Sequence, residues 1–213
     1  MYLPRQFAYP EHAEAVVRAH PLASLITHDP HGGSRACHVP MSLAVSDDGS
    51  WTLHAHVAKN NPQADDLHRA DAEVLVLFVG PHAYMSPAVY DSEQHVPTWS
   101  YVAVHCRARA HVLQGEAAKD ALLKTLIGEH EPAYAAQWRS LPKDYTERML
   151  AGVVAFELRV HDVQCAVKLN QHRPQAHRAM HQRYANGNAN ERALAAWMER
   201  LALLDAPQTS DPT

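Results

Sequence analysis

The run from Trp99 to Leu113 constrains the fold more than any other segment of the chain. Along it, apolar or small side chains alternate with charged ones. Alternation with a period of two over such a length is typical of an antiparallel strand with one packed and one solvated face. The run therefore predicts a long, half-buried strand, with one face formed by Val102, Val104, Cys106, Ala108, Ala110 and Val112 and the other by His105, Arg107, Arg109 and His111.

Shorter patterns complete the predicted architecture. The apolar run 72–80 predicts a strand buried on both faces. Further strands are predicted at 22–28, 34–45, 50–58, 152–160 and 164–170, and helices at 11–20, 62–69, 116–131, 142–150, 174–185 and 190–204. About seven strands with helices inserted late indicate a mainly β protein with helices (α+β), a β-barrel with helical additions. The last helix is either a lid over the barrel or a dimer contact.

Composition and motifs exclude several classes of protein. No apolar run approaches the ~18–20 residues that cross a bilayer, and the first residues contain no signal-peptide core, so we expect no membrane association. Three cysteines without a CxxC pair suit a reducing compartment and predict a cytoplasmic protein. GxGxxG, GxxxxGK[ST] and GxSxG are all absent, which argues against Rossmann, P-loop and α/β-hydrolase enzymes.

The segment HAHVAKNNP (54–62) contains the densest group of candidate binding residues. Strand alternation places His54 and His56 on one face, and Lys59, Asn60 and Asn61 follow directly before a helix start. Backbone N–H groups at a helix start, with a lysine beside them, form a plausible anion site. The alternative is an ordinary capped loop without a ligand.

Histidines are unusually frequent, at 17, and two pairs have spacings that merit attention. His54 and His56 would hold a metal only with a third ligand such as His38 or His105. His177 and His181 lie four apart on a predicted helix, but the glutamate of HExxH is missing, so they are interpreted as a solvated helix face.

Aromatic side chains gather in two further stretches, 80–90 and 96–101. Tyr84, Tyr90, Trp99 and Tyr101 lie there in predicted loops or strand ends, where aromatic rings need a surface to pack on. Each alone is explained by core packing. Together, and with an anion-binding loop in the same chain, they favour a pocket for a planar cofactor.

The motifs in their order resemble one known family. MYLPRQF, HVP (38–40), HVAKNNPQ, GPHAYMSPAVY, VPTWSYVAVH and KLNQHR are similar to the PaiB family of FMN-binding negative transcriptional regulators. This resemblance covers Met1 to about Arg173. It implies an FMN-binding split β-barrel with helical insertions, and a homodimer whose cofactor sites lie at the subunit interface. We accordingly expect a cofactor-binding domain over 1–173, a C-terminal helical extension over 174–205 and a disordered tail over 206–213.

The resemblance also implies which side chains contact the flavin, whereas no catalytic residue is identified. HVAKNNP and KLNQ correspond to phosphate- and flavin-facing segments, with Thr98 and Trp99 near the ring. The predicted cofactor-binding set is His38, His56, Lys59, Asn60, Asn61, Tyr84, Ser86, Tyr90, Thr98, Trp99, Lys168 and Gln171. Direct DNA binding is doubtful despite the family name, because the net charge is −4.

A second branch of the same family provides the alternative function. The sequence SPAVY (86–90) resembles piperazate synthases, which bind heme b and form an N–N bond on a small N-hydroxylated amine. In that branch the axial histidine lies in a segment that matches His56. The resemblance therefore implies either FMN, or heme b with His56 as the ligand to iron.

Overall fold

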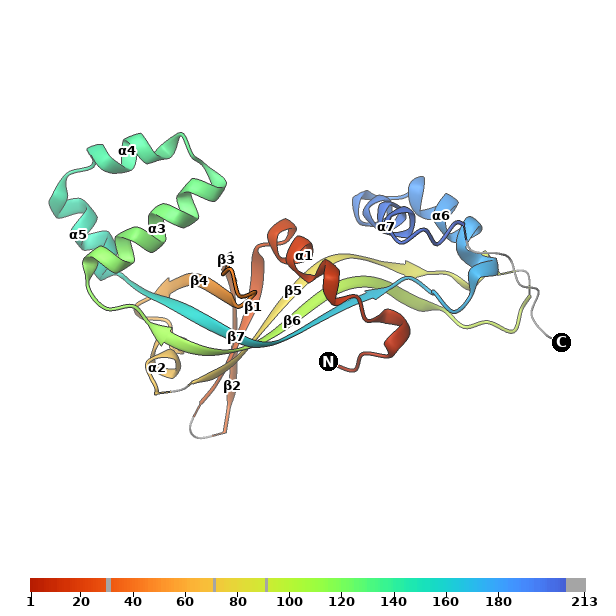
Figure 1. Ribbon diagram of the computed structural model, residues 1–213, viewed down its shortest axis with the longest axis horizontal. Helices are drawn as coiled ribbons and strands as arrows, with labels where there is room; N and C mark the ends of the chain where they lie inside the picture. The colour runs from red at the N-terminus through yellow and green to blue at the C-terminus, as the bar shows by residue number, and fades with distance from the viewer. Residues whose placement is uncertain (30–31, 71, 91, 206–213) are drawn as a thin grey trace. The chain divides into compact units, whose positions relative to one another are not determined.

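In the computed structural model the alternating run forms strand β6 (Thr98–Val112), with its packed and solvated faces as predicted. The structure describes residues 1–29, 32–70, 72–90 and 92–205. The predicted disordered tail, 206–213, lies outside these residues. The described strands form one sheet of seven, in the order β2-β1-β5-β6-β7-β4-β3 (Figure 1).

Most strand boundaries follow the sequence pattern, but not all of them do. The predicted strand 34–45 is divided at Met41, and the predicted strands 152–160 and 164–170 are one continuous strand. Besides β6, the strands are β1 (Leu22–His28), β2 (Ser34–Pro40), β3 (Ser42–Val45), β4 (Trp51–Ala58), β5 (Glu73–Met85) and β7 (Val153–Lys168).

The prediction for 72–80 is wrong about burial. Along β5 the side chains of Val74, Val76 and Phe78 are buried, whereas Leu75 and Leu77 are half-buried and Val79 is 55% exposed. Within the single chain, the second face of this strand is only partly covered. β5 also continues past Pro81 to Met85, so that Tyr84 lies within a strand near its end and not in a loop.

The helices lie between and after the strands. They are α1 (Ala13–Ala19), α2 (Gln63–Leu67), α3 (Glu116–His130), α4 (Tyr134–Ser140), α5 (Lys143–Ala151), α6 (His177–Ala185) and α7 (Ala189–Arg200), with 3-10 turns at Arg5–Phe7, Pro10–His12, Pro87–Val89 and Pro174–Ala176. No helix in the described part of the chain is long and apolar enough to span a bilayer.

Contacts between residues divide the chain into two units, and β5, β6 and β7 each run through both. Unit 1 comprises 1–16, 79–104 and 164–213, and unit 2 comprises 17–78 and 105–163. The division thus groups the C-terminal helices with part of the predicted barrel domain.

Each unit has its own packed interior. In unit 1, α6 and α7 pack together (Figure 1), and buried Tyr184 of α6 donates its hydroxyl to Ser100 Oγ of β6 at 2.9 Å. In unit 2, α3 packs on β7 through Leu122, Leu126 and Ala155. Antiparallel pairing of β4 with β7 places His56 opposite Ala155.

Candidate functional site

The predicted cofactor-binding residues fall into two groups, one in each unit. The group in unit 2 consists of His38, His56, Lys59, Asn60 and Asn61, and the group in unit 1 of Tyr84, Ser86, Tyr90, Thr98, Trp99, Lys168 and Gln171. We describe each group by itself.

A cavity of about 390 Å³ in unit 1 brings four of the predicted residues together: Tyr90, Thr98, Trp99 and Lys168. Lys168 is the last residue of β7 and Thr98 the first of β6. Lys168 Nζ donates to Thr98 Oγ1 at 2.8 Å and lies 5.8 Å from the centroid of the Tyr101 ring. Burial lowers the pKa of Lys168, because withdrawal from water disfavours the charged ammonium.

The same cavity is also lined by residues outside the predicted set, among them Asn170, His172 and Arg173. The pKa of His172 is lowered, first by desolvation and then by the positive charges of Arg173 and Lys168. Cations therefore already repel a further positive charge at this wall. An anion in the cavity would relieve that repulsion and raise the pKa of Lys168 again. All three lie in or beside the motif KLNQHR, whose basic composition was the available signal.

Aromatic rings border the cavity and the neighbouring strand face. Trp99 is 52% exposed and Tyr84 is 45% exposed, with their ring centroids 6.4 Å apart in an edge-to-face arrangement. His82 lies 5.8 Å from Trp99, and Tyr90 stacks on His95 at 3.8 Å. Exposed rings of this kind offer apolar surface to a planar ligand.

Two predicted residues of unit 1 instead bond to nearby backbone. Ser86 Oγ accepts from the backbone N–H of Ala88 at 3.2 Å and so caps a short 3-10 turn. Gln171 accepts from the N–H of Leu169 at 2.9 Å and donates to the carbonyl of Val167 at 2.6 Å. The polar atoms of Gln171 are thus used in holding the turn after β7.

In unit 2, the segment after β4 has the geometry of a capped loop. Asn61 Oδ1 accepts from the N–H of Gln63 at 2.9 Å. Helix α2 has only five residues, so its dipole is small. Lys59 and Asn60 are exposed, and Lys59 borders a second cavity, of about 440 Å³.

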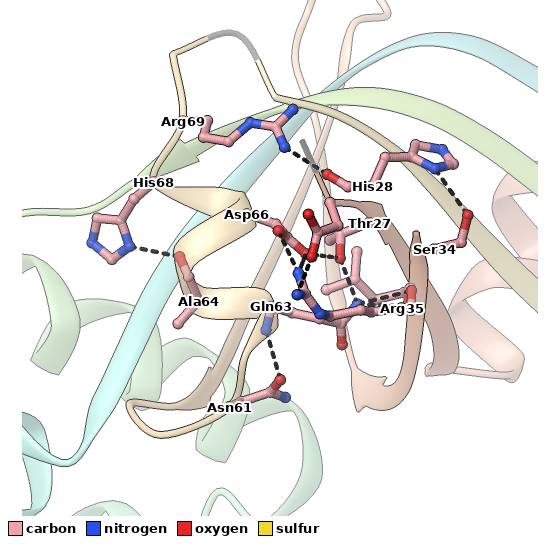
Figure 2. A network of polar contacts seen from close by, with 12 residues as sticks. Thr27, His28, Ser34, Arg35, Asn61, Gln63, Ala64, Asp66, His68 and Arg69 are labelled. Atoms are coloured by element: carbon pink, nitrogen blue, oxygen red, sulfur yellow. Dashed lines mark hydrogen bonds and ion pairs between the residues drawn. The ribbon is translucent and has the colours of Figure 1, made fainter. Parts of the chain in front are cut away.

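A buried polar network holds α2 against β1 and β2 (Figure 2). Asp66, 3% exposed, accepts from Thr27 Oγ1 at 2.7 Å and from Arg35 Nη1 at 2.7 Å and 2.9 Å. Gln63 Nε2 points to the carbonyls of Leu25 and Arg35, at 3.1 Å and 3.3 Å, and to Thr27 Oγ1 at 3.1 Å. The segment with Lys59, Asn60 and the Asn61 cap therefore leads into a firmly anchored helix. No local pattern predicted this network.

His56 lies at an apolar cavity of about 310 Å³ in unit 2. Pro40 and the α3 side chains Leu123, Leu126 and Ile127 line it, with His130 at the end of the same helix. Burial lowers the pKa of His56, which keeps its ring neutral. Its Nδ1 atom is buried and has no hydrogen-bond partner among the described residues.

The other predicted histidines do not assemble a metal site. His38 is exposed, and its Nδ1 lies 3.1 Å from Ser24 Oγ. Within the described ranges, no three His, Cys, Asp or Glu side chains are placed to hold a metal ion. The interpretation of the pair on α6 is wrong for His177, which is 2% exposed, whereas His181 bonds to Glu199 of α7 at 2.7 Å.

Comparison with known proteins identifies the family. Residues 1–162 match the family described as "Putative FMN-binding domain". The chain belongs to this family. It is also 32% identical over 205 residues to "Protease synthase and sporulation protein PAI 2" of Bacillus subtilis, covering 93% of this chain and 97% of that protein. The resemblance to the PaiB family is thereby confirmed.

Two solved structures have a fold similar to that of this chain. A flavocytochrome from Azotobacter vinelandii is similar with a TM-score of 0.59 and 16% identity, over 79% of this chain and 73% of its own. An FAD- and heme-binding protein from Mycobacterium smegmatis is similar with a TM-score of 0.57 and 18% identity, over 74% and 70%. At these identities the likeness concerns the fold, which is the predicted FMN-binding split barrel.

Proposed function

We propose that this chain binds FMN and that the unit 1 cavity receives its phosphate. The observation that carries the proposal is the gathering of Lys168, His172 and Arg173 around one cavity. A phosphate monoester carries about −1.5 to −2 charges near pH 7 and offers several acceptor oxygens. Family membership independently supports a flavin as the source of that phosphate.

The residues of the cavity fit such a ligand chemically. Lys168 and Arg173 supply charged donors, Thr98 holds the Lys168 ammonium in place, and exposed Trp99 offers apolar surface for a ring. When bound, FMN supplies a ring that accepts and releases electrons. The part of the chain is to hold the phosphate, to orient the ring and to exclude water from it.

The test is a titration of the purified chain with FMN, in which binding is measured by the quenching of flavin fluorescence. Lys168→Met should weaken binding by about 1.5–3 kcal/mol, the contribution of a charge-assisted hydrogen bond. Lys143→Met is the matched control, because the Lys143 side chain is 89% exposed on α5, and it should leave the affinity unchanged. Equal affinity of Lys168→Met and the parent chain would contradict the proposal.

Lys59 requires a separate variant, because it belongs to the other group of predicted residues. If the segment 54–62 also contacts the phosphate, Lys59→Ala should weaken FMN binding by about the same 1.5–3 kcal/mol. An unchanged affinity would confine the phosphate site to the residues of unit 1.

We further propose a homodimer with the cofactor site at its interface. The exposed cluster of His82, Tyr84 and Trp99 on unit 1 supports this, because large apolar rings are stabilised by a covering surface. A specific interface of ordinary size buries about 1,200–2,000 Å². Light scattering at micromolar concentration should give twice the chain mass of 23.7 kDa, and a monomer would contradict the dimer.

A role as a negative transcriptional regulator would follow from the family resemblance, and we propose that any such role does not use tight, specific DNA binding by this chain alone. The net charge of −4 supports this. DNA binding that depends on contacts with the phosphate backbone alone is weak and strongly salt-dependent. Nanomolar, sequence-specific binding in a gel-shift assay at physiological salt would contradict the proposal.

Heme binding, with the related N–N bond-forming activity, is the second candidate function. The observation that favours it is His56, a neutral imidazole at an apolar cavity. A histidine that ligates a metal through one ring nitrogen ordinarily donates the N–H of the other to an acceptor. His56 does not meet this requirement, because its Nδ1 has no hydrogen-bond partner among the described residues. The visible spectrum of freshly purified protein discriminates between the two functions. His56→Ala should abolish a heme Soret band, but should leave a flavin spectrum intact at high FMN.

A further inference from the structure

Tyr90 is held in place at the wall of the unit 1 cavity. Its backbone N–H bonds to the carbonyl of Pro87 at 3.0 Å, at the end of the 3-10 turn that Ser86 caps. Its hydroxyl accepts from Asn170 Nδ2 at 2.9 Å, and Asn170 is itself 5% exposed in the turn after β7. The phenol ring is therefore fixed both at its backbone and at its hydroxyl, which makes it a preorganised surface.

The imidazole of His95 covers one face of the Tyr90 ring. The two ring centroids are 3.8 Å apart and the ring planes differ by 19°, so the rings lie nearly parallel and face to face. Both side chains are half-buried, and both line the cavity. By contrast, the Trp99 ring meets those of Tyr84 and His82 at 78° and 45°. Tyr90 thus already receives a planar ring in the parallel geometry that a planar ligand would adopt.

The segment that carries His95 is otherwise weakly attached. Residues 92–97 form no hydrogen bond or ion pair with any residue that the structure describes. Their side chains are exposed apart from that of His95, and Val96 is 79% exposed. Within the described chain, the ring stack on Tyr90 is therefore the interaction that holds this segment against the cavity wall.

A stack of this kind can be exchanged for a larger one. The interaction of one stacked aromatic pair corresponds to an equilibrium factor of about two- to tenfold. A flavin ring system is larger than an imidazole and covers more of the same phenol face, so the exchange gains apolar contact area. Lys168 and Arg173 line the same cavity, so the ribityl chain would join the ring to a phosphate bound nearby.

We propose that the Tyr90 face covered by His95 is the binding surface for the planar ring of the flavin. His95 holds this surface in the free chain and leaves it when the ring binds, and residues 92–97 move with it. Because only chains with a free Tyr90 face receive the ring, His95 lowers the apparent affinity. This inference rests on the proposed function, since it names the subsite for the ring of the same ligand.

FMN titration of His95→Ala tests the exchange through the direction of the effect. This variant should bind FMN about three- to tenfold more tightly than the parent, because no stack competes with the ring. His95→Phe keeps a stacking ring and should bind no more tightly than the parent. Ser92→Ala is the matched control, because Ser92 is exposed in the same segment and lies outside the cavity lining, and it should bind as the parent does. Equal or weaker binding by His95→Ala would overturn the proposal.

A double-mutant cycle with Tyr90→Leu locates the effect at Tyr90. Tyr90→Leu should weaken FMN binding by about two- to tenfold, because the ring loses its stacking surface. In this background, the further substitution His95→Ala should have no effect. If His95→Ala tightens binding equally in both backgrounds, the competition does not occur at Tyr90 and the proposal is overturned.

Nuclear Overhauser contacts place the flavin ring directly and require no substituted chain. In the free parent, the ring protons of Tyr90 should contact those of His95. With saturating FMN, they should contact protons of the flavin ring instead. Tyr90–His95 contacts that persist in the FMN complex would overturn the proposal.

Riboflavin, which has the same ring and no phosphate, separates this inference from the proposed phosphate site. If His95→Ala tightens riboflavin binding while Lys168→Met leaves FMN affinity unchanged, the ring subsite is supported and the phosphate site is wrong. If Lys168→Met weakens FMN binding while His95→Ala has no effect on either flavin, the phosphate site is supported and the ring subsite is wrong. If neither the parent nor His95→Ala binds a flavin, both are overturned.

Discussion

Replacement of Thr27 by valine tests the buried network that anchors α2. Thr27 is 1% exposed, and its hydroxyl donates to Asp66 and accepts from Gln63 (Figure 2). Valine has nearly the same shape but no hydroxyl, so the substitution removes both bonds without opening a large cavity.

The magnitude follows from the partners that remain. A hydrogen bond to a charged group contributes about 1.5–3 kcal/mol, which applies to the bond from Thr27 to the Asp66 carboxylate. The lost bond from Gln63 contributes less, because its Nε2 keeps the carbonyls of Leu25 and Arg35. We therefore expect Thr27→Val to lower the free energy of unfolding by about 2–3 kcal/mol, or the melting temperature by roughly 5–10 °C.

Thermal and urea unfolding followed by circular dichroism measure this change. Thr27→Ser is the matched control, because it keeps the hydroxyl and loses one methyl group, at a cost of about 1 kcal/mol. If Thr27→Val is as stable as the parent chain, the hydroxyl contributes nothing and the account of the network is wrong.

Three further predictions concern pH, thiol reactivity and helix capping. Desolvation lowers the folded-state pKa of four histidines: His20, His56, His105 and His172. Because these side chains take up protons on unfolding, the urea midpoint should fall as the pH drops below about 6.5. Glutamine at these four positions should flatten the dependence of the midpoint on pH. Ellman's reagent at pH 8 should modify Cys37 alone in the folded chain, because Cys106 and Cys165 are buried and burial raises the pKa of Cys165 to about 12. Reaction of the folded Cys37→Ser variant with the reagent would contradict this. Asn188→Ala should cost about 1 kcal/mol in urea unfolding, because it breaks the reciprocal cap with Glu191 at the start of α7, and an unchanged midpoint would show that the cap is dispensable.

Much of the fold was predictable because strand alternation is a local property of the backbone. The two faces of β6 and the shared face of His54 and His56 on β4 agree with the sequence pattern. Errors arose where tertiary contacts decide the outcome. Continuous apolar composition suggested a doubly buried β5, but burial depends on what covers each face, and the described chain covers only one face fully.

The motifs that contribute to the candidate site were predictable from the sequence, but the positions of their residues relative to one another in the fold were not. Four of the predicted residues share the unit 1 cavity, whereas Gln171 and Ser86 bond to nearby backbone. Asn61 illustrates the difficulty, since the same asparagine suits an anion loop and a helix cap, and the cap uses its side-chain oxygen. Which of two compatible roles a side chain takes depends on its neighbours in space.

The sequence by itself determined the strands, the family motifs and the identity of the side chains available for a cofactor. Tertiary structure alone decided which of them meet: Thr98 and Lys168 are 70 residues apart in sequence, and Thr27 and Asp66 are 39 apart. His177 reaches carbonyls 7 and 26 residues away, and becomes buried by packing that its helical spacing with His181 does not reveal. The physical reason is that backbone geometry repeats over two to four residues, whereas cavities and buried polar networks arise from pairing between distant strands, whose partners leave no periodic signal in the sequence.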